Sequence, residues 1–232
     1  MPLIRFPQLS SIHFICTLLL VPAFWLSTSQ AVAIENESTN QAGISLQKIY
    51  ENGVYGNLFV SSFYQNGFNN NAVNYLNFSL GKNVGNSSYA FSFYTTVPRG
   101  NAEREIRLIQ QYSYRVFFAG GVSSFTVNLD ERYFNQSNEM GLRSRFRLQW
   151  VKPVDERHSL QLGWQTHFAW NDVEQKDLMQ RGFRQTRLIF GVNRELRNGN
   201  RINVNYQARF QNRAFTENVL QHHVQFLYSH RL

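Results

Sequence analysis

Apolar and polar residues alternate along most of this chain, from about Asn52 to the last residue, Leu232. In residues 141–151, for example, leucine, phenylalanine and tryptophan positions alternate with Arg143, Arg145 and Arg147. Because successive side chains of a strand point to opposite faces, this period predicts β-strands with one apolar face and one polar face.

Ten such segments follow one another to the C-terminus. They span residues 53–64, 73–82, 87–96, 104–116, 122–134, 141–151, 158–170, 182–194, 200–211 and 220–232. Alternation sustained over so many segments of this length is typical of a sheet that closes on itself with lipid outside and a polar interior. The sequence therefore predicts an all-β fold, a closed antiparallel transmembrane β-barrel of about ten strands. Eight or twelve strands fit the pattern as well, and a soluble periplasmic β-sandwich or lipocalin-like barrel is the alternative.

The connections between these segments differ in length. If both ends of a ten-stranded barrel are periplasmic, the odd-numbered links are external, and they include the longest one, residues 171–181. The periplasmic links are mostly short and carry Gly or Asn-Gly pairs, which favour tight hairpin turns. The two kinds of link support the alternating up-and-down order of the strands.

Residues 1–33 carry an export signal. Arg5 is their only charged residue, an apolar stretch runs from Phe14 to Leu26, and Ala31-Val32-Ala33 forms an A-x-A cleavage site. The apolar stretch is too short for a helix that spans a bilayer, which favours a cleaved signal peptide over an anchor. Residues 34–51 are polar with weak periodicity, so we expect a periplasmic lead-in or short plug there, followed by the barrel over residues 52–232.

Composition adds a location and expected partners. The chain combines a mean hydropathy of −0.38 with 15% aromatic residues, which suits strands with one apolar and one polar face. The net charge is +8, but the arginines alternate with apolar residues inside strands, which argues against nucleic-acid binding. We therefore expect a bacterial outer-membrane protein that contacts outer-membrane lipids, including lipopolysaccharide, and the barrel-assembly machinery during insertion.

Several segments resemble a known family. GLRSRFRLQW, with NLDERYF before it and FRQTRLIFGV after it, is similar to the bacterial outer-membrane barrel family known as domain of unknown function 2490, and EIRLIQQYSYR resembles a further segment of it. The resemblance covers roughly Leu76 to Leu232. It implies an outer-membrane barrel, and it supplies no activity and no catalytic residues.

Charged side chains are expected to gather inside the barrel. Alternation places two acidic residues, six arginines and one glutamine on inward faces, namely Glu105, Arg107, Asp130, Arg132, Arg143, Arg145, Arg147, Gln185 and Arg187. If the hairpin between the fifth and sixth segments is centred near residues 137–138, Asp130 lies opposite Arg145, Asn128 opposite Arg147, and Arg132 opposite Arg143. Two interpretations stay open, a packed structural network that fills a small barrel and a site for an anionic solute or lipid phosphate.

The histidines do not predict an active site. His158 and Ser159 are adjacent and point to opposite faces, as do His222 and His223, so neither pair can act together in catalysis or hold one metal ion. We expect no catalytic residues, no metal and no cofactor. The expected function is a non-enzymatic structural, interaction or small-solute barrel with a largely filled interior, and the alternatives are a narrow anion-selective pore and a lipid-modifying enzyme.

Overall fold

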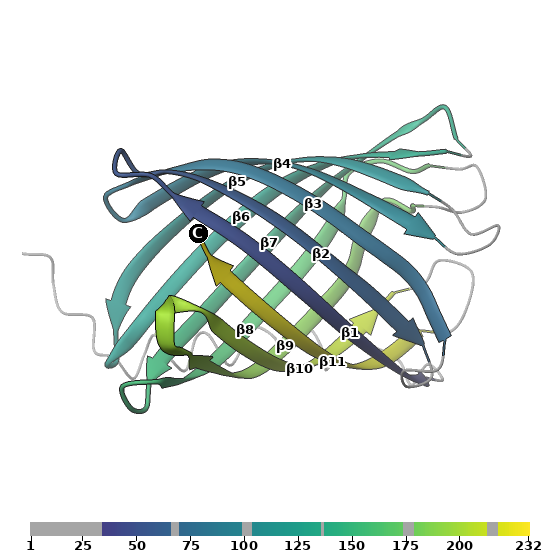
Figure 1. The fold of residues 1–232 in the computed structure, drawn as a ribbon. Helices are drawn as coiled ribbons and strands as arrows, with labels where there is room; N and C mark the ends of the chain where they lie inside the picture. Colours follow the sequence, from purple (N-terminus) through teal and green to yellow (C-terminus); the bar gives the residue numbers. More distant parts are fainter. Residues whose placement is uncertain (1–33, 66–69, 99–103, 136, 174–178, 213–217) are drawn as a thin grey trace, which may run out of the picture. The chain divides into compact units, whose positions relative to one another are not determined.

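Eleven strands form a closed β-barrel in the computed structural model, which describes residues 34–65, 70–98, 104–135, 137–173, 179–212 and 218–232 (Figure 1). Each strand pairs with its neighbours in sequence, and β1 closes the sheet against β11. The strands are β1 (Ile34–Ile49), β2 (Val54–Gln65), β3 (Asn70–Val84), β4 (Ser87–Pro98), β5 (Glu105–Phe118), β6 (Gly121–Phe134), β7 (Met140–Pro153), β8 (His158–Ala169), β9 (Gly182–Glu195), β10 (Arg201–Gln211) and β11 (Asn218–Arg231). A single 3-10 turn, η2 (Arg197–Gly199), precedes β10.

The first strand corrects the expectation for residues 34–51. That segment is β1, part of the barrel wall, and it pairs with β11 in parallel from Ile34↔Asn218 to Gln47↔Arg231. The barrel therefore has eleven strands where about ten were expected, and one of its pairings is not antiparallel. The sequence pattern missed β1 because Ser38, Asn40 and Ala42 point outward. These side chains are polar or small, whereas the outer face of a barrel strand is expected to be apolar.

An odd strand number places the start of β1 and the end of β11 at opposite ends of the barrel, so the first and last strand residues do not share a side as the ten-stranded scheme assumed. We name the two ends by their connections. The turn end carries the short links, such as residues 119–120 and 196–200, and the loop end carries the links after β2, β4, β6, β8 and β10. In Figure 1 the C-terminus lies at the turn end.

Tight turns at the turn end follow from local sequence. Ala119 and Gly120 both have positive φ, 49° and 73°, and so do Asn198 and Gly199, 75° and 73°. Two successive residues with positive φ match the right-handed twist of a hairpin, and Asn and Gly adopt that backbone conformation at low cost. The Gly and Asn-Gly signals of the sequence correctly marked these hairpins.

The barrel is apolar outside and polar inside. Leu80, Phe91 and Phe190 expose half or more of their surface, whereas Asp130 and His223 inside the barrel are 0% exposed. A small apolar cluster at the loop end, Phe134, Ala169, Val173 and Met179, is the one cluster of buried apolar side chains among the described residues. Within the same ranges no helix has the length and apolar character needed to cross a membrane.

Candidate functional site

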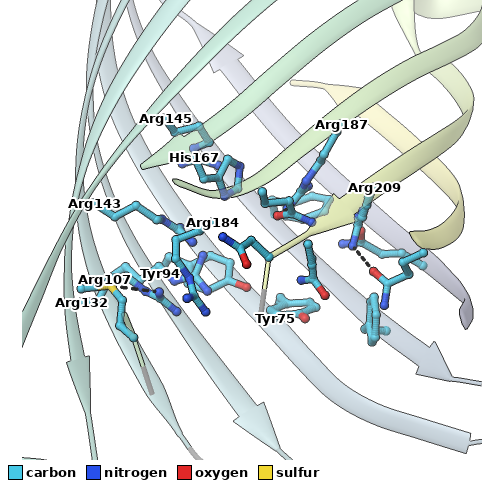
Figure 2. A pocket seen from close by; sticks show the side chains of 18 residues that line it. Tyr75, Tyr94, Arg107, Arg132, Arg143, Arg145, His167, Arg184, Arg187 and Arg209 are labelled. Carbon is cyan, nitrogen blue, oxygen red and sulfur yellow. Dashed lines mark hydrogen bonds between the residues drawn. The ribbon is translucent and has the colours of Figure 1, made fainter. Parts of the chain in front are cut away.

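A cavity of about 540 Å³ lies inside the barrel toward the loop end (Figure 2). Its wall combines seven arginines, several aromatic rings and neutral amides. The charged and aromatic residues that line it are Arg107, Arg132, Arg143, Arg145, Arg184, Arg187, Arg209, His167, Phe59, Phe63, Tyr75 and Tyr94. Strands from all around the barrel therefore contribute to one site.

Glu105, the first residue of β5, holds two of these arginines. It is 7% exposed, and its carboxylate pairs with Arg107 at 2.5 Å and with Arg132 on the neighbouring β6. The Arg107 guanidinium also lies 4.5 Å from the centre of the Tyr94 ring, and that of Arg132 lies 4.9 Å from the Phe134 ring. Stacking of this kind holds the flat guanidinium groups in place.

Asp130 on β6 holds two more. Its carboxylate accepts hydrogen bonds from Arg143 at 2.5 and 3.1 Å and from Arg145 at 3.2 Å. The register differs by two residues from the expected one, because Asp130 lies opposite Arg143, Asn128 opposite Arg145, and Arg132 opposite Gly141. Arg145 still reaches Asp130 diagonally, since neighbours two residues along an adjacent strand lie within reach of long side chains.

Three cavity arginines have no ion pair with any described residue. Arg187 donates to Gln185 at 2.8 Å, and Arg209 donates to Gln207 at 3.2 Å and to Gln221 at 3.3 Å, all of which are neutral amides. The third, Arg184, donates weakly to an amide in the loop after β8. The site is therefore built with more positive than negative charge in the described part of the chain.

Arg147, the remaining expected residue, lies farther along β7 toward the turn end. In the strand register it lies opposite Gln165 on β8, and it does not line the cavity. The structure thus brings together eight of the nine residues selected from the sequence, six as cavity wall and two, Glu105 and Asp130, as the carboxylates behind that wall.

Arg184 reaches the cavity through a β-bulge. His167 pairs with Gln185 and Phe168 with Phe183, so Arg184 is an extra residue on β9 without an opposite partner. A bulge interrupts the alternation of faces. Arg184 therefore lines the cavity, although strict alternation would place it on the outer face. The alternation of faces along the sequence could not identify Arg184 as an inward residue. In residues 200–211 the same alternation does place Arg209 on the polar face.

Aromatic rings form a continuous wall on one side of the cavity, which we call the aromatic wall. His223 and Phe63 stack with their centroids 5.6 Å apart, Phe63 meets Tyr75 edge-on at 6.2 Å, and Tyr75 lies 5.5 Å from Tyr94. The row steps across β11, β2, β3 and β4 and ends at Arg107 on β5, whose guanidinium covers Tyr94. Sequence reasoning did not include these rings, because inward tyrosine and phenylalanine residues break the apolar-out pattern.

A network of neutral amides lies in the turn-end half of the interior. Asn203 donates to Asn193 and to Gln161 across the intervening strand, and Asn205 donates to Asn203 and to Gln225. Gly191 makes room for this network, because a Cβ there would lie 1.9 Å from the Asn205 side-chain oxygen. Hydrogen-bonded amides occupy the lumen below the charged cavity, while the loop-end half retains open space.

His167, His222 and His223 have separate hydrogen-bond partners. His223 is hydrogen-bonded to Thr39 at 2.9 Å inside the barrel, His167 to Gln165 at 2.5 Å, and His222 to Tyr206 at 2.6 Å on the outer face. Within the described ranges, no hydrogen bond joins a serine to a histidine, and no three metal-ligating side chains come together. Arginine is the residue that dominates the chemistry of this site.

Guanidinium groups recognise carboxylate and phosphate through paired N–H donors, and they keep their charge at all working pH values. A cavity lined by seven of them, four held by two carboxylates and three without a described counter-charge, presents fixed donors and excess positive charge. The arrangement can bind an anion.

Comparison with known proteins identifies a family without a known activity. The family model described as protein of unknown function (DUF2490) matches residues 32–219, and the chain belongs to that family. This match confirms the resemblance found in the sequence and extends over β1 as well. No curated protein and no solved structure matches the chain.

Proposed function

We propose that the protein is an integral outer-membrane β-barrel without catalytic activity that binds a small anionic solute in its arginine-lined cavity. The membrane part of this proposal is supported by the inverted distribution of polarity. Large apolar side chains such as Leu80 and Phe91 are exposed on the outside, while carboxylates and amides are buried inside. A bilayer would cover that apolar surface. Lipopolysaccharide and the barrel-assembly machinery are the partners that such a location brings.

The observation that carries the anion-binding part is the charge balance of the cavity. Arg187 and Arg209 are interior arginines hydrogen-bonded to neutral amides, without a carboxylate among the described residues. A buried charge without a counter-charge costs several kcal/mol even after relaxation and water entry. A bound anion would supply the missing counter-charge, which is the physical reason to expect one.

The neutral network below the cavity favours binding over free passage. Asn193, Asn203 and Asn205 join side chains of β9 and β10 across the turn-end half of the lumen, and Gln225 extends the network to Gln41 on β1. A solute that enters from the loop end meets these amides after the arginines. The second candidate, a narrow anion-selective pore, is favoured by the same arginine lining, so conductance separates the two.

The location is tested by export in a Gram-negative host, membrane fractionation and gel mobility with and without heating. We expect the protein in the outer membrane, with mobility that changes on heating, and solubility without detergent after export would refute a membrane barrel. In planar bilayers we expect no steady current. A sustained anion-selective current would establish the pore instead.

Binding is tested by isothermal titration calorimetry of the detergent-solubilised barrel with inorganic phosphate. The double variant Arg187→Gln/Arg209→Gln should lower phosphate affinity at least tenfold, because it removes two of the three cavity arginines that have no ion pair with a described residue. Arg147→Gln is the matched control, since Arg147 is an interior arginine that does not line the cavity. Equal losses in the two variants would refute the proposed site.

A further inference from the structure

We infer that the solute carries its negative charges on a flat aromatic ring, as in an aromatic polycarboxylate or an aromatic phosphate. This inference rests on the anion-binding function proposed above and adds the chemical class of the ligand. It comes from the two unlike walls of the cavity, because an inorganic anion needs only one of them.

The two walls stand on different parts of the barrel. The aromatic wall comes from β11, β2, β3 and β4, with Phe63 and Tyr75 at its centre. The arginines without ion pairs come from β9 and β10, and Arg143 and Arg145 come from β7. In Figure 2 Tyr75 and Tyr94 lie on one side of the space, and Arg145, His167 and Arg187 lie on the other.

The volume of the cavity suits a ring and not a single ion. About 540 Å³ lies within the range of 300–1,000 Å³ that is usual for organic ligands. One phosphate ion on the arginine wall would leave the aromatic wall without contact. A flat ring that bears carboxylates can place its edge oxygens on the guanidinium groups and its face or edge against Tyr75 and Tyr94, the geometry that aromatic pairs prefer.

The polar groups of the aromatic wall fit the same orientation. Arg107 already covers one face of Tyr94 at 4.5 Å and is itself ion-paired with Glu105. Arg107 on the aromatic side is thus ion-paired, whereas Arg187 on the far side has no ion pair with a described residue. A ligand with an aromatic body and anionic substituents matches this division, and guanidinium planes also stack favourably on aromatic rings.

The experiment compares two tricarboxylates of equal charge and similar shape, benzene-1,3,5-tricarboxylate and its saturated analogue cyclohexane-1,3,5-tricarboxylate, by calorimetry on the detergent-solubilised barrel. We expect the aromatic acid to bind at least tenfold more tightly. Tyr75→Leu/Tyr94→Leu should abolish this preference, because it should lower the affinity for the aromatic acid much more than the affinity for the saturated acid. Tyr75→Phe/Tyr94→Phe, which keeps both rings, should retain the preference, and the outward Tyr206→Leu should change neither affinity.

The outcomes separate the inference from the proposed function. Equal affinities for the two acids in the unaltered protein, or binding of inorganic phosphate alone, would overturn the aromatic ligand and leave anion binding intact. Failure of phosphate and of both tricarboxylates to bind would overturn the proposed function and this inference with it. The comparison of the two acids needs no variant, so it decides the question even if the leucine variant does not fold.

Discussion

Asp130 is the residue whose removal should disturb the interior most. It is 0% exposed and accepts hydrogen bonds from Arg143 at 2.5 and 3.1 Å and from Arg145 at 3.2 Å. Asp130→Asn keeps the shape of the side chain and removes its charge. Two neighbouring guanidinium groups would then share an interior without their common carboxylate.

The magnitude follows from the burial of both partners. Removing one member of a buried ion pair costs about 3–5 kcal/mol, because the other charge stays buried. The side chain of Arg143 is 10% exposed and that of Arg145 is 24% exposed to the cavity. Solvent in the cavity screens part of the repulsion between the two guanidinium groups. We therefore expect the free energy of unfolding to fall by about 2–4 kcal/mol, slightly less than for a fully buried pair.

Urea unfolding in detergent micelles, followed by the heat-modifiable gel band, measures this loss. Glu195→Gln is the control, because the Glu195–Arg201 pair at 2.8 Å is more than half exposed on both sides and should contribute about 0–1 kcal/mol. Asp130→Asn should also tighten phosphate binding, since it adds net positive charge beside the cavity. A stability equal to that of Glu195→Gln would refute the view that Asp130 neutralises a buried arginine pair.

Three further predictions address the outer face, the neutral network and the turn end. Phe146→Arg should cost about 2–4 kcal/mol if its outward position lies near the middle of a bilayer, and unfolding in lipid vesicles that matches the unaltered protein would contradict the membrane assignment. Gly191→Ala should lower the urea midpoint measurably, because its Cβ would collide with the Asn205 side-chain oxygen at 1.9 Å, whereas Gly199→Asn, at a turn with positive φ, should have little effect. The third concerns Asp155, where the backbone N–H of Arg157, followed by contacts with His158, lowers the pKa of the carboxyl to about 2. Because the folded pKa is depressed, this stabilisation is present above the unfolded pKa near 4 and is lost as the pH falls toward 2. Asp155→Asn should therefore reduce the change of the urea midpoint with pH between about pH 4 and pH 2. A pH dependence equal to that of the unaltered protein would contradict this role.

Much of the barrel could be predicted because a strand records its two environments at every second residue. Alternation located β2 to β11 to within a few residues and assigned Arg143, Arg145 and Arg147 to one face, and Asn-Gly and Gly signals marked the hairpins. These features are local, since they depend only on side-chain direction along one strand and on backbone conformation in one turn.

Closure, register and the composition of the cavity were decided by the tertiary structure. β1 is established by its pairing with β11, because the first half of its outward face, Ser38, Asn40 and Ala42, lacks the apolar signal. The hairpin register that sets Asp130 against Arg143, and the bulge that turns Arg184 inward, depend on how β6 to β9 pair with one another. Which arginines lack carboxylates depends on contacts between strands that are distant in sequence. Such contacts exist only once the sheet has closed into a barrel, so no periodic pattern within a single strand can specify them.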